Sequence, residues 1–548
     1  MHIVPSFKAA VIQFEPILLD KPTNMSRLMG FIEEAGRQGA RLAVLPELAT
    51  TGYCFRSRED VAPLVEPIPG PTTDAIAEVA SRFHMHVVVS LPEVEPATGV
   101  YYNAAALVGP AGVIGKYRKV HSFYDETVWA KDGDLGFPVF ETPLGRLAII
   151  VCMDADFFES ARIPALKGAD VICFPTAWVS RAPSRSWRAR ALENGVYFLA
   201  ADRWGTERGI SFGGGSCIIS PLGEVLSSLD RGDGVVIHEV NVRGSRDKYV
   251  ERVGDLMDMR APDEYHAVLR NSHLWPVSMA SRLPGGRRSR LRVFQFDPKP
   301  GGNGENLAAM AELLEASQAE SGCDIAVYPE LCVSGIPEPG GAGPRSAAES
   351  IPGPATERLA LLAAEFDTHI VAGMIERDGE GRLYNSAVLL EPGGVVGVYR
   401  KIHLNEYDSV WATRGDLGMP CFDVPAGRVG MAIGSELLVP EVARCLAKNG
   451  VDIILAPSVW PWREWDFVLS DRAANNDCYL ALANQGAGGE GRSLIYGNPS
   501  ARESAHVDGD RGWATLETST DPDSFCRRKE MLRKVQPVWY DAIVRKRV

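Results

Sequence analysis

The sequence predicts an α/β protein in which one domain is written twice, each copy with a mixed sheet covered by helices. Passages of the first half recur in the second half at a nearly constant spacing. Within each half, short apolar runs rich in β-branched residues alternate with helical patterns. Residues 145–162 read "GRLAIIVCMDADFFESAR" and residues 427–444 read "GRVGMAIGSELLVPEVAR", and the two align without a gap. Gly434 of the second passage then stands opposite Cys152 of the first.

The repeat extends over a whole domain. "VIQFEP" at 11–16 matches "VFQFDP" at 293–298, a shift of 282 residues (293 − 11). Three further passages match at 282 or 283: "LPELATTGY" with "YPELCVSGI", "GKYRKVH" with "GVYRKIH", and "GADVICFPTAW" with "GVDIILAPSVW". Such a long period excludes a short-repeat solenoid. We predict a first domain over 1–280, a Pro/Gly/Arg-rich linker over 281–290, and a second domain with a C-terminal tail over 291–548.

Each predicted element of the first copy rests on its own pattern. Strands are expected where apolar runs have strand length, and helices where apolar residues recur every three or four positions. A Gly-Pro turn inside "NAAALVGPAGVIGKYRK" predicts an antiparallel hairpin over 103–119. The expected strands are 8–14, 41–47, 86–93, 146–152 and 169–175, and the expected helices are 24–39 and 72–84.

Composition limits the classes of function. The chain has 548 residues, of which 45% are hydrophobic and 23% charged, and no apolar run could span a membrane. The first residues lack the pattern of a secretory signal, and the ten cysteines are scattered without a CxxC, so we expect a reduced, cytoplasmic protein without a zinc site. A net charge of −13 argues against nucleic-acid binding. No phosphate loop or dinucleotide fingerprint is present, and we expect no metal or organic cofactor.

Three polar residues of the first copy follow predicted strands or turns. Glu47 follows "RLAVLP", Lys119 follows the hairpin, and Cys152 closes the run "LAIIV". Residues at strand ends of an α/β sheet can meet in a shared crevice. A thiol, a carboxylate and an amine supply the nucleophile, the base and the cation that acyl transfer needs. Each residue alone also fits an ordinary role as a buried cysteine, a helix cap or a solvated charge.

The sequence around these residues resembles that of the nitrilase superfamily of carbon–nitrogen hydrolases. "LPELATTGY" is similar to the family's glutamate motif, "GKYRKVH" to its lysine motif, and "CMDADFFESAR…LKGADVICFPTAW" to its cysteine motif; "MRAPDEY" at 259–265 resembles its closing segment. The resemblance covers about residues 7–267 and, more weakly, 291–510. It implies a four-layer αββα sandwich in each copy, and a family that commonly dimerises sandwich to sandwich.

The resemblance also implies roles for individual residues. Cys152 corresponds to the nucleophile, Glu47 to the general base and Lys119 to the oxyanion partner. The family's second glutamate maps onto Glu126, although "DGD" stands here where the family often has "PGD". The backbone N–H of Met153 is expected to complete the oxyanion site. The implied product of the first step is a thioester on Cys152.

The substrate class is predicted less directly. Met153-Asp154 follows the cysteine, and Cys-x-Asp is more similar to the amidase and carbamoylase branches than to the nitrile-cleaving branch, which commonly has Trp-Glu. We therefore expect a small amide or N-carbamoyl substrate, with a small nitrile as the alternative. Trp178, Arg181 and Arg185 are predicted at the pocket rim, where an arginine could bind a substrate carboxylate. Solvated arginines are the alternative interpretation.

The second copy keeps most of the predicted site. Glu330 stands opposite Glu47, Lys401 opposite Lys119, and Asp408 opposite Glu126, while Gly434 replaces the nucleophile. Ser435 is adjacent, but on a strand its hydroxyl would face away from Glu330. We expect no catalysis by the same route in this copy. A retained buried ion pair explains the conserved charges, and a ligand-sensing role is the alternative.

Three readings of the whole chain follow. We favour an enzyme with one active copy, in which the second copy supplies the interface of an internal pseudo-dimer; assembly into a larger homo-oligomer is left open. A non-catalytic regulatory or binding protein is a second possibility, and an acyl transferase that passes the thioester to an amine is a third.

Overall fold

The computed structural model describes residues 6–180, 182–275, 282–337, 343–486, 491–497 and 503–546. The chain divides into two compact units. Unit 1 consists of Met1–Lys248 together with Val538–Val548, and unit 2 consists of Tyr249–Pro537. The division thus falls before residue 249 and after residue 537, and not at the predicted linker over 281–290, part of which already belongs to strand β17 (Arg288–Gln295).

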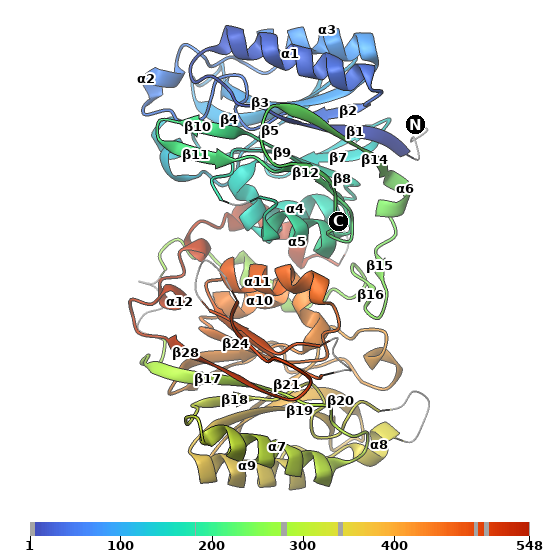
Figure 1. Cartoon of the computed structure of the whole chain (residues 1–548), viewed down its shortest axis with the longest axis vertical. Helices are drawn as coiled ribbons and strands as arrows, with labels where there is room; N and C mark the ends of the chain where they lie inside the picture. The colour runs from blue at the N-terminus through green and yellow to red at the C-terminus, as the bar shows by residue number, and fades with distance from the viewer. Residues whose placement is uncertain are drawn as a thin grey trace. The chain divides into compact units, whose positions relative to one another are not determined.

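Unit 1 contains two six-stranded mixed sheets (Figure 1). Neighbouring central strands run parallel, and the outer strands join them antiparallel. The first sheet has the order β14 (Gly234–Asn241), β1 (Ser6–Gln13), β2 (Leu42–Val44), β3 (His86–Val94), β4 (Tyr101–Gly109) and β5 (Gly112–Arg118). The second has the order β13 (Val225–Leu229), β12 (Ser216–Ile219), β9 (Tyr197–Asp202), β8 (Val171–Thr176), β7 (Gly145–Ile149) and β6 (Val139–Thr142).

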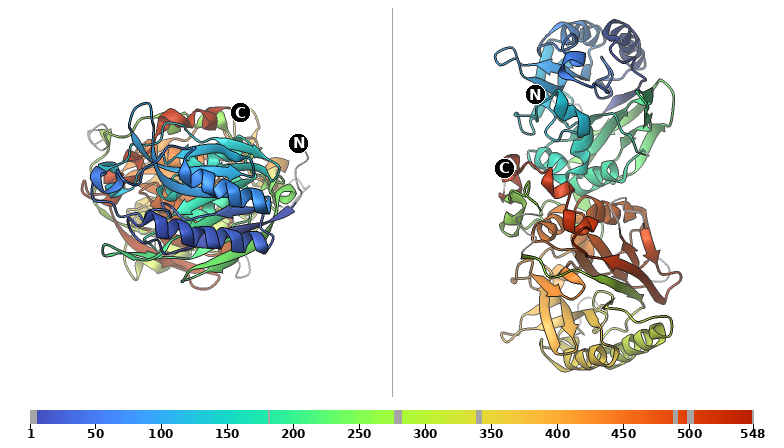
Figure 2. Two further views of the ribbon diagram at one scale, coloured as in Figure 1. Left: turned by 90° about the horizontal axis from the view of Figure 1, so that it is seen from above. Right: turned by 90° about the vertical axis from the view of Figure 1, so that its left-hand side faces the viewer.

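Helices cover the outer face of each sheet, so unit 1 has four layers. Helices α1 (Lys21–Arg37) and α3 (Pro71–Phe83) lie side by side on the first sheet (Figure 2), and α4 (Phe158–Leu166) and α5 (Arg185–Asn194) cover the second. The two sheets pack face to face through β1, β2 and β3 against β8, β9 and β12. The predicted αββα sandwich is therefore confirmed. The predicted strands, hairpin and helices are present, although β2 and β7 each end three residues before the end of the predicted strand. Shorter elements are α2 (Arg58–Val61), α6 (Val242–Ser245), β10 (Trp204–Glu207) and β11 (Ile210–Gly213).

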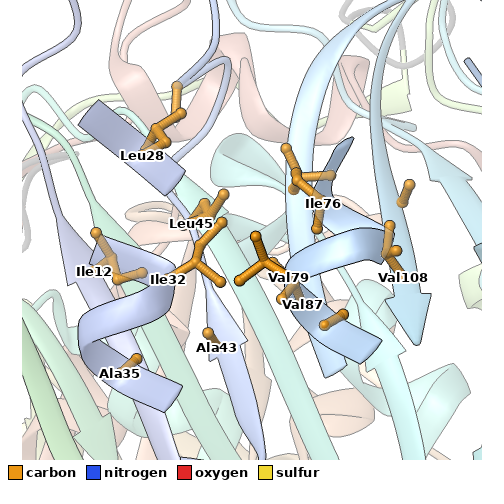
Figure 3. Packing of buried hydrophobic residues seen from close by; sticks show 14 of the residues in the cluster. Ile12, Leu28, Ile32, Ala35, Ala43, Leu45, Ile76, Val79, Val87 and Val108 are labelled. Atoms are coloured by element: carbon orange, nitrogen blue, oxygen red, sulfur yellow. The ribbon is translucent and has the colours of Figure 1, made fainter. Parts of the chain in front are cut away.

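The outer core of unit 1 explains why these helices form. On α1, Leu28, Ile32 and Ala35 recur at helical spacing and are buried against the first sheet (Figure 3). Ile76 and Val79 of α3 complete the same cluster. The alternate residues of β1 to β4 that face these helices are apolar, so the sheet buries both of its faces.

Unit 2 repeats the architecture. Its first sheet, β21-β20-β19-β18-β17-β28, has the strand order of the first sheet of unit 1, and β22 to β27 form the second sheet. Helices α7, α9, α10 and α11 occupy the places of α1, α3, α4 and α5. The bounds are β18 (Ile325–Val327), β19 (His369–Arg377), β20 (Leu383–Glu391), β21 (Gly394–Arg400), β22 (Cys421–Val424), β23 (Gly427–Met431), β24 (Ile453–Ser458), β25 (Tyr479–Asn484), β26 (Leu494–Tyr496), β27 (Glu503–His506), β28 (Gly512–Ser519), α7 (Asn303–Gln318), α9 (Pro354–Phe366), α10 (Pro440–Lys448) and α11 (Asp466–Ala474).

The closing segments of the two copies are exchanged between the units. The segment after the first copy, with the 3-10 helices η3 (Pro262–Glu264) and η4 (His266–Leu269), belongs to unit 2, where η4 packs on α10. The segment after the second copy, which contains η11 (Pro537–Val544), belongs to unit 1 from residue 538 through the last described residue, 546. The two segments share a pattern, "PDEYHAV" at 262–268 and "PVWYDAI" at 537–543.

Candidate active site

Glu47 lies in the turn that follows β2 and is completely buried. Its Oε1 accepts hydrogen bonds from Asn103 Nδ2 and Lys119 Nζ, both at 2.8 Å, and its Oε2 accepts one from the backbone N–H of Ala177 at 3.0 Å. Strands of both sheets supply these partners, because Asn103 lies on β4 and Ala177 follows β8. The carboxylate is thereby held in one orientation at the interface between the two sheets.

Lys119 joins two carboxylates. Directly after β5, its buried Nζ donates to Glu47 at 2.8 Å and to Glu126 Oε1 at 2.5 Å. Burial by itself lowers the pKa of a lysine, but Glu126 and Glu47 together raise the pKa of Lys119 well above its usual value. The ammonium therefore stays charged at neutral pH.

Glu126 lies in the 3-10 helix η1 (Tyr124–Val128) and is also buried. Besides Lys119, it accepts hydrogen bonds from Tyr53 Oη at 2.5 Å and from Asn103 Nδ2 at 3.3 Å. Burial raises the pKa of Glu126 to about 7; Glu47 also raises it, and Lys119 opposes the shift. Asn103 thus links the two carboxylates on either side of the lysine.

Cys152 opens the 3-10 helix η2 (Cys152–Asp156) just beyond β7. The prediction that it closes a strand is wrong in detail, because the ladder stops at Ile149 and Cys152 has the left-handed φ of 48°. A non-glycine residue in this region is strained, and such residues cluster at functional sites. Its Sγ lies 3.9 Å from the carbonyl oxygen of Ala177, whose N–H holds Glu47.

The environment of Cys152 favours the neutral thiol. The side chain is buried, and burial together with the negative charge of Glu47 raises the pKa of Cys152 well above its usual value, while Lys119 opposes the shift. A resting thiol of this kind needs a neighbouring base before it can attack. The same geometry places Met153 at the second position of η2, where backbone N–H groups lack partners within the helix.

A cavity of about 410 Å³ adjoins this cluster. Glu126 and Tyr53 belong to both, whereas Glu47, Lys119 and Cys152 are not among the residues that line the cavity. Five of its twelve lining residues are aromatic, and its charged groups include Arg56, Arg208 and Asp125. The lining residues are Tyr53, Cys54, Phe55, Arg56, Phe123, Tyr124, Asp125, Glu126, Trp129, Val179, Arg208 and Ile210.

Two of the residues predicted at the pocket rim, Trp178 and Arg185, have other described surroundings. Trp178 donates its backbone N–H to Asp202 at 2.9 Å, and its ring packs edge-on against Trp187. Arg185 begins helix α5 and is half-buried. Neither is among the residues that line the cavity, whereas Val179 of the same loop is. Arg181 lies outside the described residues.

Unit 2 contains the same network without the thiol. Glu330 Oε1 accepts from Asn385 Nδ2 and Lys401 Nζ, both at 2.8 Å, and Oε2 accepts from the backbone N–H of Val459 at 3.0 Å. Lys401 also pairs with Asp408 at 2.6 Å. Burial raises the pKa of Glu330, against the opposing charge of Lys401. The residues predicted for the second copy, Glu330, Lys401 and Asp408, therefore meet in space.

Gly434 keeps the backbone of the missing cysteine. Its φ is 51°, against 48° for Cys152, and it too opens a 3-10 helix, η7 (Gly434–Leu438). A Cβ added to Gly434 would lie 2.3 Å from Glu330 Oε2, so the carboxylate fills space that a side chain would need. The strand argument for Ser435 is wrong, since it lies in η7. Its hydroxyl is buried and has no hydrogen-bond partner within the part of the chain that the structure describes.

Sequence reasoning missed Asn103 and Tyr53. The signal for Asn103 was present, because "YNAAALV" recurs as "YNSAVLL" and keeps the asparagine as Asn385. Tyr53 gave no such signal, since Ile336 stands opposite it in the second copy.

The described ranges contain neither a metal-ligand cluster nor a membrane-spanning helix of the kinds specified next. No group of three or more His, Cys, Asp or Glu side chains there could hold a metal ion. None of the helices in those ranges combines the length and the apolar character that crossing a bilayer requires.

Comparison with known proteins decides the family. The family model "Carbon-nitrogen hydrolase" matches this chain twice, over residues 8–247 and 290–502. The chain belongs to the carbon–nitrogen hydrolase family. It is a tandem member of the nitrilase superfamily, as its repeated motifs predict.

Several relatives of this carbon–nitrogen hydrolase match less than half of the chain and nearly all of their own length. A "Nitrilase" of Pyrococcus abyssi is 42% identical over 260 residues, covering 47% of this chain and 98% of its own. The "Omega-amidase NIT2" of Homo sapiens is 31% identical over 254 residues, covering 43% and 90%. The crystal structure of an amidase from Nesterenkonia sp. aligns with 27% identity and a TM-score of 0.39, covering 45% of this chain and 95% of that one.

Proposed function

We propose that the site around Cys152 hydrolyses the carbon–nitrogen bond of a small amide or N-carbamoyl compound through a thioester. One observation carries the proposal: Ala177 holds Glu47 through its N–H while its carbonyl contacts the thiol of Cys152, beside the charged Lys119. Base, nucleophile and cation are thereby gathered in one buried site.

The first half-reaction forms the thioester. Glu47 takes the thiol proton as Cys152 Sγ bonds to the carbonyl carbon, and the carbonyl oxygen becomes an oxyanion. Lys119 Nζ and the backbone N–H of Met153 stabilise that negative charge. The tetrahedral intermediate then collapses, the carbon–nitrogen bond breaks, and the departing nitrogen receives the proton from Glu47. Ammonia or an amine leaves, and the acyl group stays on Cys152.

The second half-reaction uses water. Glu47 takes a proton from the water as its oxygen attacks the thioester carbon, and the same two donors hold the oxyanion. Collapse breaks the carbon–sulfur bond, the thiolate recovers the proton from Glu47, and the carboxylic or carbamic acid is released. Because the pKa of Cys152 is raised, the base is needed in both halves.

The cavity supports a small substrate. Its volume of about 410 Å³ is at the lower end of ligand pockets. Arg56 on its wall is exposed and could pair with a carboxylate at the far end of a substrate. An amide substrate also agrees with the name of the NIT2 relative, an omega-amidase. Asp154 after the cysteine favours amides over nitriles, although the Pyrococcus abyssi relative is called a nitrilase.

Ammonia release from a panel of compounds tests the proposal. The panel contains primary amides, N-carbamoyl amino acids, ureides and nitriles, each assayed with the parent protein and with Cys152→Ala. We expect release confined to amides or N-carbamoyl compounds, and a loss on the order of 10⁴-fold in the variant. Ammonia release from nitriles alone would mean that the substrate is a nitrile and not an amide or N-carbamoyl compound. Silence throughout, with no acyl adduct by intact mass, would favour a regulatory protein.

A further inference from the structure

Three further buried polar residues form a hydrogen-bonded chain next to the turn that carries Cys152. His121 lies two residues after Lys119, and Asp154 lies two residues after Cys152. His121 Nδ1 is 2.8 Å from Asp154 Oδ1, and His121 Nε2 is 3.1 Å from Tyr540 Oη. All three side chains are buried. Tyr540 comes from the closing segment that follows the second copy and belongs to unit 1.

Asp154 ties the turn of the nucleophile to the segment that carries the lysine. Its Oδ2 accepts hydrogen bonds from the backbone N–H of Val151 at 2.9 Å and from Tyr117 Oη at 2.7 Å. Its Oδ1 accepts from the backbone N–H of His121 at 3.1 Å. The position of Cys152 relative to Lys119 therefore depends on how firmly Asp154 and His121 are held.

The hydroxyl of Tyr540 favours the His121 tautomer that carries its proton on Nδ1. Since Asp154 is an acceptor, His121 Nδ1 carries the proton that it donates, and Nε2 is left as an acceptor. The hydroxyl of Tyr540 donates to that nitrogen. The ring of Phe157 stacks on the imidazole of His121, with 3.9 Å between the ring centroids and 10° between the ring planes. Phe157 thus contacts the face of the imidazole, and Tyr540 contacts the edge that carries Nε2.

Unit 2 contains the same arrangement, with a tyrosine from the closing segment of the first copy. Tyr265 Oη lies 2.8 Å from His403 Nε2, and His403 Nδ1 lies 2.8 Å from Glu436 Oε1. Glu436 in turn accepts from the backbone N–H of Ile433 at 2.9 Å. Here the turn that is held begins with Gly434. In each unit the tyrosine comes from the closing segment of the other copy.

We propose that Tyr540 is a positioning residue for the reaction at Cys152, acting through His121 and Asp154. The second copy then contributes to catalysis through the segment that follows it, although its own site lacks a nucleophile. Deleting that contribution leaves a buried imidazole nitrogen without its donor, and the turn of Cys152 loses its alignment with Glu47 and Lys119. This inference rests on the proposed function, in which Cys152 is the nucleophile.

The chain offers a matched pair of variants. Tyr540→Phe removes one hydroxyl from the unit with the thiol, and Tyr265→Phe removes the equivalent hydroxyl from the unit without it. Both keep the ring and both leave one histidine nitrogen unsatisfied. Tyr265→Phe also removes the acceptor of the Ala261 backbone N–H, so it should lower the melting temperature of the full-length protein at least as much as Tyr540→Phe. We expect Tyr540→Phe alone to lower kcat, on the order of tenfold, with KM changed less than about twofold.

Alkylation of Cys152 by iodoacetamide, followed by peptide mass mapping, measures alignment without any substrate. We expect the rate to fall on the order of tenfold in Tyr540→Phe, and to stay at the parent value in Tyr265→Phe. Equal rates and equal kcat in the parent and Tyr540→Phe would overturn the inference. Equal losses in both variants would also overturn it, because they would indicate general destabilisation. If the amide panel were silent, the alkylation rates would still decide on Tyr540.

Discussion

The two sites of this chain share a network of hydrogen bonds around a buried glutamate and differ in whether a thiol stands beside it. In both, a buried glutamate accepts from an asparagine, a lysine and a backbone N–H, at distances that agree within 0.1 Å. The lysine in both pairs with a second carboxylate. Only unit 1 places a thiol on the turn beside this network. The comparison separates what a buried charge cluster needs for stability from what catalysis adds.

The difference has a physical basis. Removing one partner of a buried ion pair leaves an unpaired charge and costs about 3–5 kcal/mol, so stability alone is a sufficient reason to retain the cluster in unit 2. Removing the thiol has no such cost, because glycine adopts the φ of 51° at position 434 without strain. Glu330 Oε2 then lies where a Cβ would be, which makes the loss hard to reverse at that position alone.

Neutralising the two equivalent glutamates gives the largest contrast. Glu47→Gln removes the base and should lower kcat on the order of 10³-fold, whereas Glu330→Gln should leave kcat within about twofold. Ammonia release with the best compound of the panel measures both. The two variants remove the same charge beside the same kind of lysine, so each serves as the control for the other. A comparable loss in Glu330→Gln would mean that the second site takes part in the reaction.

Adding one methyl group to the second site tests how it is packed. Gly434→Ala places a Cβ 2.3 Å from Glu330 Oε2 on a backbone with φ of 51°. We expect the free energy of unfolding to fall by about 2–3 kcal/mol, from backbone strain and from displacement of the carboxylate. Urea denaturation measures this loss. Gly304→Ala, at a helical glycine with no atom within 4 Å of the added carbon, is the control and should not destabilise. Unchanged stability in Gly434→Ala would contradict the packing described for Glu330.

Titration of Glu126 in unit 1 should make the free energy of unfolding depend on pH. Burial raises the pKa of Glu126 from 4.5 to about 7, so the folded protein binds this proton more tightly than the unfolded chain. The stabilising contribution of Glu126 is thus fully present below pH 4.5 and is lost as the pH rises through about 7. Relative to Glu126→Gln, the free energy of unfolding should fall across this interval by an amount on the order of 2 kcal/mol.

Urea titrations of the parent and Glu126→Gln at several pH values measure that difference. Comparing the two proteins removes the contribution of other titrating groups, such as Asp477, whose pKa burial raises to about 6. A difference that is flat between pH 4 and 8, a range set by the shift to about 7, would show that Glu126 does not titrate in this way.

The smallest expected effect concerns the hydroxyl that only unit 1 has. Tyr53 donates to Glu126 at 2.5 Å, whereas Ile336 occupies the equivalent position of the second copy. Tyr53→Phe should cost about 1 kcal/mol of stability and raise the pKa of Glu126 further, because a donor to its charged form is lost. Repeating the pH series in this background measures the shift. If the pH midpoint of the Glu126 titration were lower in Tyr53→Phe than in the parent, the role of the hydrogen bond would be contradicted.

Much of this arrangement could be predicted from the sequence, because the repeat supplies an internal comparison. Matching the two copies identified Glu330 and Lys401 as partners of the same kind as Glu47 and Lys119, and "VWA" in both copies located Asp408. Apolar periodicity located the strands and helices. The roles of these residues in a reaction remain predictions.

The rest depended on contacts that a local pattern does not carry. The run "LAIIVC" continues beyond the hydrogen-bonded ladder, so periodicity could not separate the end of β7 from the turn of Cys152. The exchange of closing segments depends on where residues 249–275 and 538–546 dock, which involves partners far away in the sequence. The aromatic walls of the cavity come from several separate segments for the same reason.

The stoichiometry of the acyl-enzyme tests most directly whether one of two similar sites carries the chemistry. The best compound of the panel is mixed with the full-length protein, quenched in acid within one turnover, and analysed by intact mass and peptide mapping. We predict one acyl group per chain, attached to Cys152 and absent from Cys152→Ala. An acyl group on a residue of the second copy, or turnover with no acyl group on Cys152, would contradict the account.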